Sequence, residues 1–163
     1  MSLEYVQPKY NSYKTEGNTI VPFNEVGRTL NFDVKIIDTE EKDYIKINND
    51  IFKPKTSYKY VLIKFKFKIH ELSNGKDDFD MYDFCELKDI KNNTTYIDSR
   101  DRLGSLIYTT NKKKDKNLIY MGKFKPGVIK YAYSIFEVPK NCEINNLVLT
   151  DTGNEFDVKF KIN

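Results

Sequence analysis

The sequence has no tryptophan, one histidine and only two cysteines among 163 residues. Two cysteines are too few for the disulfide framework of a small secreted domain, and no Cys/His cluster predicts a zinc site. A bridge between Cys85 and Cys142 is one alternative, and two separate free thiols is the one that we favour. His70 has no serine or cysteine beside it in a recognisable nucleophile motif, so we expect it at the surface.

Glycine, proline and long apolar runs are also scarce. The seven glycines and five prolines include no glycine-rich phosphate-binding loop. No segment approaches the ~18 consecutive apolar residues of a membrane span. Neither sign of charge dominates, since the chain has 27 basic and 24 acidic residues and a net charge of +3. This balance argues against the segregated basic surface of nucleic-acid-binding proteins, so no nucleic-acid partner is expected.

The chain does have ample material for one packed domain. Hydrophobic residues make up 39% of it and aromatic residues 14%, while 31% are charged. A chain of this length buries roughly two thirds of its unfolded surface. We therefore expect a single soluble domain with a sizeable core.

Residues 58–70 alternate between apolar and polar side chains. The apolar set shares one parity and consists of Val61, Ile63, Phe65, Phe67 and Ile69. A helix, at about 100° per residue, would scatter these side chains around its axis. The run therefore predicts an antiparallel strand with one face on a core and one in water. Residues 156–163 repeat the pattern.

Shorter extended runs fill much of the remaining chain. We expect strands at 29–37, 44–47, 80–89, 96–97, 118–124, 128–138 and 147–149. Turn residues separate them at 73–76, 91–94 and 125–127, and no run predicts a helix of ten residues or more. The pattern predicts an all-β, antiparallel sandwich of about seven or eight strands over residues 23–163. Residues 1–22 are polar and aperiodic, which predicts an N-terminal tether or loosely docked arm.

Several of these segments together resemble a known family. They are Val26-Gly27, the strand at 61–69, Phe84 to Asp89, the closing strand at 156–162 and, most specifically, Phe124-Lys125-Pro126-Gly127 followed by Ile135 to Lys140. They are similar to Gram-positive exported proteins, often lipoproteins, whose module is an immunoglobulin-like sandwich related in shape to a small secreted mycobacterial antigen.

The resemblance implies an immunoglobulin-like fold and an extracellular, membrane-anchored lipoprotein of a low-GC Gram-positive bacterium. It transfers no catalytic residue, because its motifs are structural. The lipid-carrying cysteine is lacking near the start, and residues 1–5 have neither a basic start nor an apolar stretch. Two alternatives remain open: a cytosolic protein, or a chain that begins after a removed export segment and is lipid-anchored in its precursor.

Two lysine ladders are the first candidate binding residues, at Lys64, Lys66 and Lys68 and at Lys159 and Lys161. If their strands are neighbours, five ammonium groups line one surface and attract an anionic envelope polymer such as teichoic acid, phospholipid head groups or an acidic protein. The alternative is that alternating lysines keep the sandwich soluble and protect exposed edges. An aromatic surface for glycan or protein contact would come from Tyr58, Tyr60, Tyr131 and Tyr133.

The densest carboxylate cluster is a candidate metal site and consists of Asp77, Asp78, Asp80 and Asp83. Calcium takes six to eight oxygen ligands, some of which a carboxylate loop supplies. The spacing does not match an EF-hand, and we favour a solvated strand entry.

The leading hypothesis is a non-catalytic, extracellular or cell-envelope-associated binding module with no cofactor and an unknown ligand. One alternative is a metal-assisted hydrolase that uses the carboxylates of residues 77–83. The other is a purely structural spacer domain.

Overall fold

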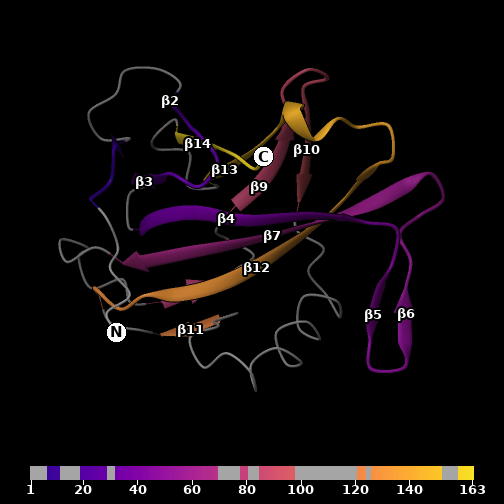
Figure 1. Ribbon diagram of the computed structural model, residues 1–163, viewed down its shortest axis with the longest axis horizontal. Helices are drawn as coiled ribbons and strands as arrows, with labels where there is room; N and C mark the ends of the chain where they lie inside the picture. Colours follow the sequence, from indigo (N-terminus) through magenta and orange to yellow (C-terminus); the bar gives the residue numbers. More distant parts are fainter. Residues whose placement is uncertain are drawn as a thin grey trace.

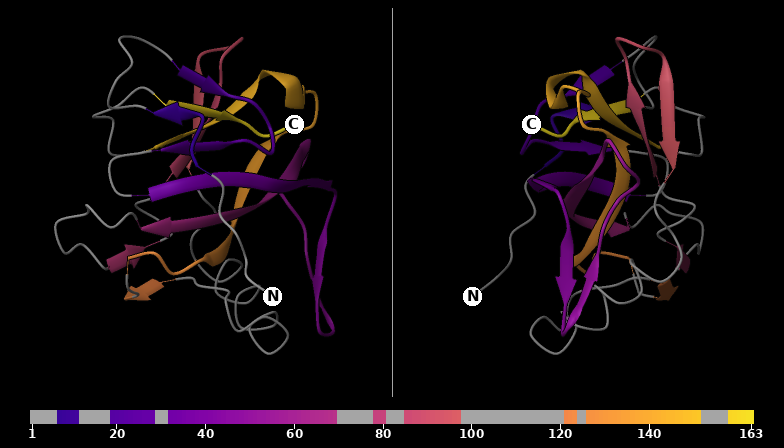
Figure 2. Two further views of the ribbon diagram at one scale, coloured as in Figure 1. Left: turned by 60° about the vertical axis from the view of Figure 1, so that its left-hand side comes forward. Right: turned by 90° about the vertical axis from the view of Figure 1, so that its right-hand side faces the viewer.

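Two five-stranded sheets stack face to face in the computed structural model (Figures 1 and 2), which describes residues 7–11, 19–28, 32–69, 78–80, 85–97, 121–123, 126–151 and 158–163. The first sheet has the order β1 (Tyr10–Asn11), β3 (Val26–Arg28), β4 (Phe32–Lys42), β7 (Tyr58–Ile69) and β12 (Lys130–Pro139). The second has the order β10 (Thr94–Ile97), β9 (Cys85–Asp89), β13 (Leu147–Asp151), β14 (Val158–Lys161) and β2 (Thr19–Val21).

Two small sheets complete the described part of the chain. One pairs β8 (Asp78–Asp80) with β11 (Met121–Lys123), and the other pairs β5 (Ile45–Ile47) with β6 (Asp50–Phe52). A 3-10 turn, η3 (Ile144–Asn146), precedes β13. Among the described residues, no helix has the length and apolar character needed to cross a membrane.

The alternating side chains of β7 place the apolar set on one face of the strand, toward the core, as predicted. Val61, Ile63, Phe65 and Phe67 are all 0% exposed and point into the space between the sheets. They meet Leu87, Leu149 and Phe160 of the second sheet in one core cluster. Fully burying such a side chain contributes about 1.5–3 kcal/mol relative to leaving it exposed. The core therefore lies where the period-two pattern places it, and the expected all-β sandwich is confirmed, with parallel pairing only at β1–β3 and β2–β14 among the described strands.

Gly27 lies where the N-terminal strands bring the two sheets together. A Cβ at this position would be 2.7 Å from Cγ2 of Val21 on β2 and 2.8 Å from Cε1 of Phe160 on β14. Such contacts are too short for real Cβ atoms, so glycine is required for this close approach.

Parts of the segment that we expected to be an arm join the sheets. β1 pairs in parallel with β3, and β2 pairs in parallel with β14. Val21 is 0% exposed and belongs to the core. The predicted boundary between arm and domain at residue 22 would therefore assign Val21 to the arm, although this side chain lies in the core of the sandwich.

A β-bulge changes which side chains of β4 face the core. Before it, Val34 and Ile36 point inward opposite Phe67 and Phe65 of β7. The register shifts between Ile36 and Asp38, after which Thr39 and Glu41 share the inward parity and Asp38 and Glu40 the outward one. A bulge adds one residue to one strand and so reverses the face of everything after it.

The β5–β6 hairpin covers part of the outer face of the first sheet. Ile45 and Ile47 pack against Tyr60 of β7 and Ile135 of β12, and these four residues form a second buried cluster. Figure 2 shows the hairpin on the side of the first sheet that faces away from the second. The sequence predicted a short strand near 44–47, and the structure adds that the hairpin packs on Tyr60 of β7 and Ile135 of β12.

Candidate functional site

The outer face of the first sheet carries most of the predicted lysine ladder. We define the basic–aromatic face as the outward lysines and tyrosines of three adjacent strands: Lys35 on β4, Lys64, Lys66 and Lys68 on β7, and Tyr131 and Tyr133 on the edge strand β12. Two rows run across these strands. Lys35 is opposite Lys66, which is opposite Tyr131; Asp38 is opposite Lys64, which is opposite Tyr133.

Lys64 is held over two tyrosine rings. Its Nζ lies 5.3 Å from the centroid of the Tyr131 ring and 5.4 Å from that of Tyr133. A cation within about 6 Å of a ring face is attracted by the ring quadrupole. Tyr133 also packs against the hairpin cluster. The hairpin therefore helps to fix a ring that in turn positions the ammonium group of Lys64.

Lys66 is placed against a second positive charge. It lies directly opposite Lys35 across the β4–β7 ladder, and both side chains are half-buried. Like charges in this position destabilise a sheet. Partial burial lowers the pKa of Lys66, and the neighbouring Lys35 ammonium lowers it further. An anion that contacts both groups would reduce this repulsion.

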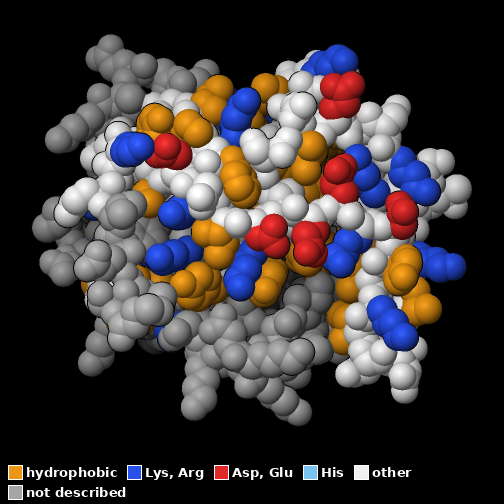
Figure 3. All heavy atoms as spheres, in the orientation of Figure 1, with side chains coloured by type: hydrophobic (Ala, Val, Ile, Leu, Met, Phe, Trp, Pro, Cys, Tyr) orange, Lys and Arg blue, Asp and Glu red, His pale blue; other side chains and the backbone are white. Residues whose placement is uncertain are grey.

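Acidic side chains on the same face have contacts of their own within the chain. Asp33, opposite Lys68, is 1% exposed and accepts hydrogen bonds from Nε and Nη2 of Arg28 at 2.7 and 3.3 Å. Asp38 accepts a bond from the Thr39 backbone N–H at 3.0 Å, and Glu40 is 3.4 Å from Lys42 Nζ. Figure 3 shows the result: basic, acidic and hydrophobic side chains alternate over the strands that cross the middle of the view.

The second lysine ladder lies elsewhere. Lys159 and Lys161 are on β14, which pairs with β13 and β2 in the second sheet, whereas β7 pairs with β4 and β12 in the first. The strands are not neighbours, so the five lysines do not line one surface. The sequence showed both ladders but could not show which sheet each strand enters.

The predicted carboxylate cluster falls largely outside the described residues, as does His70. Asp77 and Asp83 lie outside them, while Asp78 and Asp80 are backbone partners of Lys123 and Met121 in the β8–β11 pair. Within the described ranges, no group of three or more His, Cys, Asp or Glu side chains is placed to hold a metal ion. The calcium site stays a prediction.

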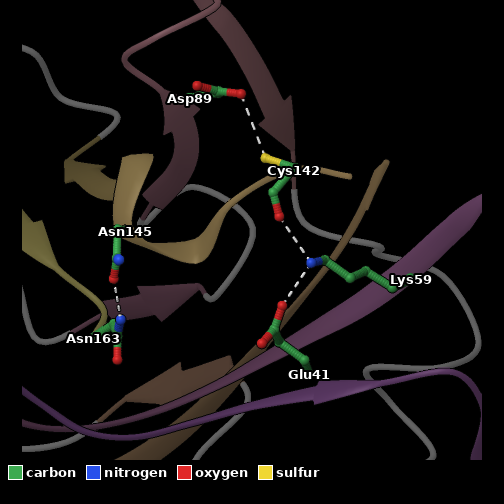
Figure 4. Close-up of polar contacts among 6 residues, drawn as sticks. All are labelled: Glu41, Lys59, Asp89, Cys142, Asn145 and Asn163. Carbon is green, nitrogen blue, oxygen red and sulfur yellow. Dashed lines mark hydrogen bonds and ion pairs between the residues drawn. The ribbon is translucent and has the colours of Figure 1, made fainter. Parts of the chain in front are cut away.

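A set of polar contacts, exposed at Glu41 and buried at Cys142 and Asp89, joins the two sheets at one end of the sandwich (Figure 4). Lys59 of β7 donates to Oε1 of Glu41 on β4 at 2.6 Å and to the backbone carbonyl of Cys142 at 2.8 Å. The Cys142 thiol in turn donates to Oδ2 of Asp89 on β9 at 3.4 Å. We call these four residues, Glu41, Lys59, Asp89 and Cys142, the cross-sheet polar cluster.

Asp89 also holds the turn between β9 and β10. Its Oδ1 accepts bonds from the backbone N–H groups of Lys91 and Asn92, and its Oδ2 accepts one from the Asn92 side chain at 2.9 Å. Burial alone would raise the pKa of Asp89. The bonds from Asn92, Cys142 and Lys91 outweigh it and lower that pKa. The carboxylate is therefore charged and fully used by its neighbours.

Cys142 is a free, buried thiol. Burial raises its pKa to about 11, and the hydrogen bond to Asp89 and the charge of that carboxylate act in the same direction. The thiolate is the nucleophilic form, so this cysteine is poorly suited to covalent chemistry at neutral pH. A second link near this end joins the side chains of Asn163 and Asn145. The arrangement fits a structural role.

Some residues of these sites were missed at the level of sequence. Lys35 shares the outward parity of its strand, which was a usable signal, but its pairing with Lys66 depends on the register between strands. Asp89 and Cys142 are 53 residues apart, and nothing in either segment indicates that they meet.

Comparison with models of protein families finds no match, and no curated protein matches the chain. Solved structures are similar in fold. A conserved hypothetical protein from Bacillus anthracis has 16% identity over 88% of this chain and 95% of its own, with a TM-score of 0.58. An uncharacterized β-sandwich protein from Clostridium difficile 630 has 13% identity over 92% and 99%, with a TM-score of 0.53.

The yjhA protein from Bacillus subtilis is also similar, with 11% identity over 86% of this chain and 99% of that one and a TM-score of 0.51. All three come from Gram-positive bacteria. At these identities the likeness concerns the fold alone. The chain is thus similar, over nearly its whole length, to β-sandwich proteins whose function is uncharacterized.

Proposed function

We propose that the chain is a non-catalytic, cell-envelope-associated binding module whose basic–aromatic face contacts an anionic partner. The observation that carries this proposal is the placement of Lys66 directly opposite Lys35 on the outer face of the first sheet. Two positive charges in this position repel each other. A negatively charged partner that reaches both ammonium groups reduces that repulsion.

Lys64 supports the same reading. Its ammonium group lies over Tyr131 and Tyr133, so it is held in place beside the Lys35–Lys66 pair. A side chain that is already positioned loses less conformational freedom when it binds. The rings of Tyr131 and Tyr133 add apolar contact area next to the charge.

The envelope location rests on the family resemblance of the sequence to exported Gram-positive lipoproteins. Structural neighbours from Bacillus and Clostridium agree with that source. The location predicts an export signal that ends in a lipid-carrying cysteine at the start of the precursor. Reading the gene upstream of residue 1 tests it, and a precursor that starts at Met1 would contradict it.

Capture from envelope fractions tests the binding proposal. The folded domain is immobilised and exposed to isolated envelope at ~50 mM and ~300 mM salt, because screening weakens contacts between exposed charges. We expect salt-sensitive capture that is lost when Lys64, Lys66 and Lys68 are all changed to Glu. The matched control changes Lys159 and Lys161 to Glu on the second sheet and leaves capture intact. Equal capture by the triple variant would overturn the proposal.

A further inference from the structure

The β5–β6 hairpin has one side on the first sheet and the other side in water. Ile45 and Ile47 are buried and pack on the sheet. Lys46 and Ile51 are direct partners across the hairpin and have the opposite parity, so they point away from the sheet. Figures 1 and 2 show the turn of the hairpin projecting away from both five-stranded sheets. The outward side is therefore open to a partner.

Four exposed side chains make up this side, and we define them as the outer hairpin face: Tyr44, Lys46, Ile51 and Lys53. Tyr44 and Lys53 lie one residue beyond the β5–β6 ladder and continue the outward parity. Tyr44 is 55% exposed and Ile51 is 57% exposed, and both lysines are exposed as well. Figure 3 shows hydrophobic and basic side chains gathered together over the hairpin, at the lower right of the view.

The carboxylates near the hairpin do not belong to the outer hairpin face. Asp50 is the ladder partner of Ile47, so it has the parity of the side that meets the sheet. Asp43 lies in the bend before the hairpin. Within residues 44–53, all of which the structure describes, no acidic side chain shares the outward parity. The face therefore combines two exposed apolar side chains with charge of one sign.

This combination fits a lipid surface better than a protein. A stable protein interface buries about 800 Å² on each partner, and its centre is depleted in lysine. Four side chains on two three-residue strands supply far less area. At a lipid surface, apolar side chains enter the boundary between head groups and acyl chains, while lysine stems lie beside them and keep their ammonium groups in the head-group layer. Tyrosine suits the same boundary, because its ring is apolar and its hydroxyl is polar.

We infer that the outer hairpin face docks on the surface of an anionic lipid bilayer. Ile51 and the ring of Tyr44 enter the interfacial layer, and Lys46 and Lys53 contact the negative head groups. This site goes beyond the proposed function, because it shares no residue with the basic–aromatic face. Two lysines and two partly exposed apolar side chains give weak, reversible docking, in which salt removes the contribution of the lysines.

Cosedimentation of the whole chain with lipid vesicles tests the inference. We expect binding to vesicles of phosphatidylcholine and phosphatidylglycerol, reduced by salt, and much weaker binding to phosphatidylcholine alone. Because one lysine near an anionic surface is worth roughly fivefold in partitioning, the double variant Lys46→Glu/Lys53→Glu should lower binding at least about tenfold. The matched control, Lys159→Glu/Lys161→Glu on the second sheet, should leave it unchanged.

The absence of tryptophan from the chain allows a fluorescent reporter of insertion. Ile51→Trp places the only indole on the outer hairpin face, and its emission should shift to the blue when anionic vesicles are added, because the ring leaves water. The control is Ile97→Trp on β10, at a position that is 70% exposed on the second sheet. Its emission should not shift. A shift at residue 97 without one at residue 51 would overturn the inference.

The remaining outcomes separate this inference from the proposed function. Failure of the unmodified chain to bind anionic vesicles, equal binding to neutral vesicles, or binding that survives the Lys46→Glu/Lys53→Glu change would each overturn the inference. If vesicle binding is lost only when Lys64, Lys66 and Lys68 are changed to Glu, lipid is the partner of the basic–aromatic face: the hairpin inference fails and the proposed function stands. If hairpin-dependent vesicle binding persists while envelope capture ignores that triple change, the proposed function fails and the hairpin inference stands.

Discussion

The cross-sheet polar cluster and the basic–aromatic face use polar side chains in opposite ways. In the cluster, charges alternate in sign and are linked by contacts within the chain, from Glu41 through Lys59 and Cys142 to Asp89. On the face, Lys66 is opposite Lys35, and Lys64 rests on aromatic rings. The two regions differ in how charge is arranged: the cluster places opposite charges in contact within the fold, whereas the face places like charges side by side, which is why we propose that it contacts a negative partner.

The largest effect that would sharpen this contrast is expected for Asp89→Ala. It leaves the N–H groups of Lys91 and Asn92 and the Cys142 thiol without their acceptor, so the free energy of unfolding should fall by about 1–3 kcal/mol. Urea denaturation measures it, with exposed Asp43→Ala as the control. A loss within about 0.5 kcal/mol, the range of ordinary surface changes, would contradict the structural role.

Lys59→Met should have the next largest effect. Methionine retains an apolar stem, but the Cys142 carbonyl loses its bond to the Lys59 ammonium, and Glu41 loses its ion pair. Because Glu41 remains solvated, we expect a loss of only about 1 kcal/mol in unfolding free energy. Binding to envelope fractions, measured on the same protein, should match that of the unmodified chain. Weaker binding would show that the two regions are coupled.

The contribution of Asp89 to the pH dependence of stability should be a smaller effect than those of the two substitutions, and it should be confined to low pH. Its hydrogen bonds lower its pKa in the folded state below the unfolded value of about 3.9. A lowered folded pKa contributes stability that is complete above the unfolded pKa and is lost as pH falls through the folded pKa. Stability of the unmodified chain should therefore decline below about pH 4, and Asp89→Asn should lack this part of the decline. Identical pH profiles of the two proteins would contradict the assignment.

The smallest effect is expected for alkylation of Cys142. With its pKa raised to about 11 from 9.0, the thiol holds about a hundredfold less thiolate near pH 8 than an ordinary cysteine. Iodoacetamide should leave Cys142 unmodified in the folded chain and modify it readily in urea, as peptide mapping by mass spectrometry would report. Rapid labelling of Cys142 under native conditions would show that the cluster opens.

The strands were predictable because the core imposes a local period. In β7 every second side chain is apolar, so the inward face could be assigned without knowing any partner strand. The same was true of Val34 and Ile36 in β4. Turns such as Pro126-Gly127 were readable because Gly127 has φ 83°, a conformation that glycine adopts without strain.

The candidate sites depend on information that is not local. The pairing of Lys35 with Lys66 follows from the register of β4 on β7, and the placement of Lys159 follows from the sheet that β14 joins. The bulge after Ile36 reverses the faces of Thr39 and Glu41, and no residue there marks it in advance. Only the first strand of the hairpin was predicted, at 44–47, because few of the hairpin's residues, Ile45, Ile47 and Phe52, pack on the sheet.

The most direct test of the account is a paired measurement on Lys66→Glu: its binding to isolated envelope fractions and its free energy of unfolding in urea. The variant replaces a Lys–Lys contact by a Lys–Glu contact with Lys35. We expect binding to weaken at least tenfold while stability is unchanged or rises by about 0.2–1 kcal/mol, as for an opposite-charge cross-strand pair. Unchanged binding together with lower stability would show that Lys66 serves the fold, and would contradict the assignment of this face to recognition.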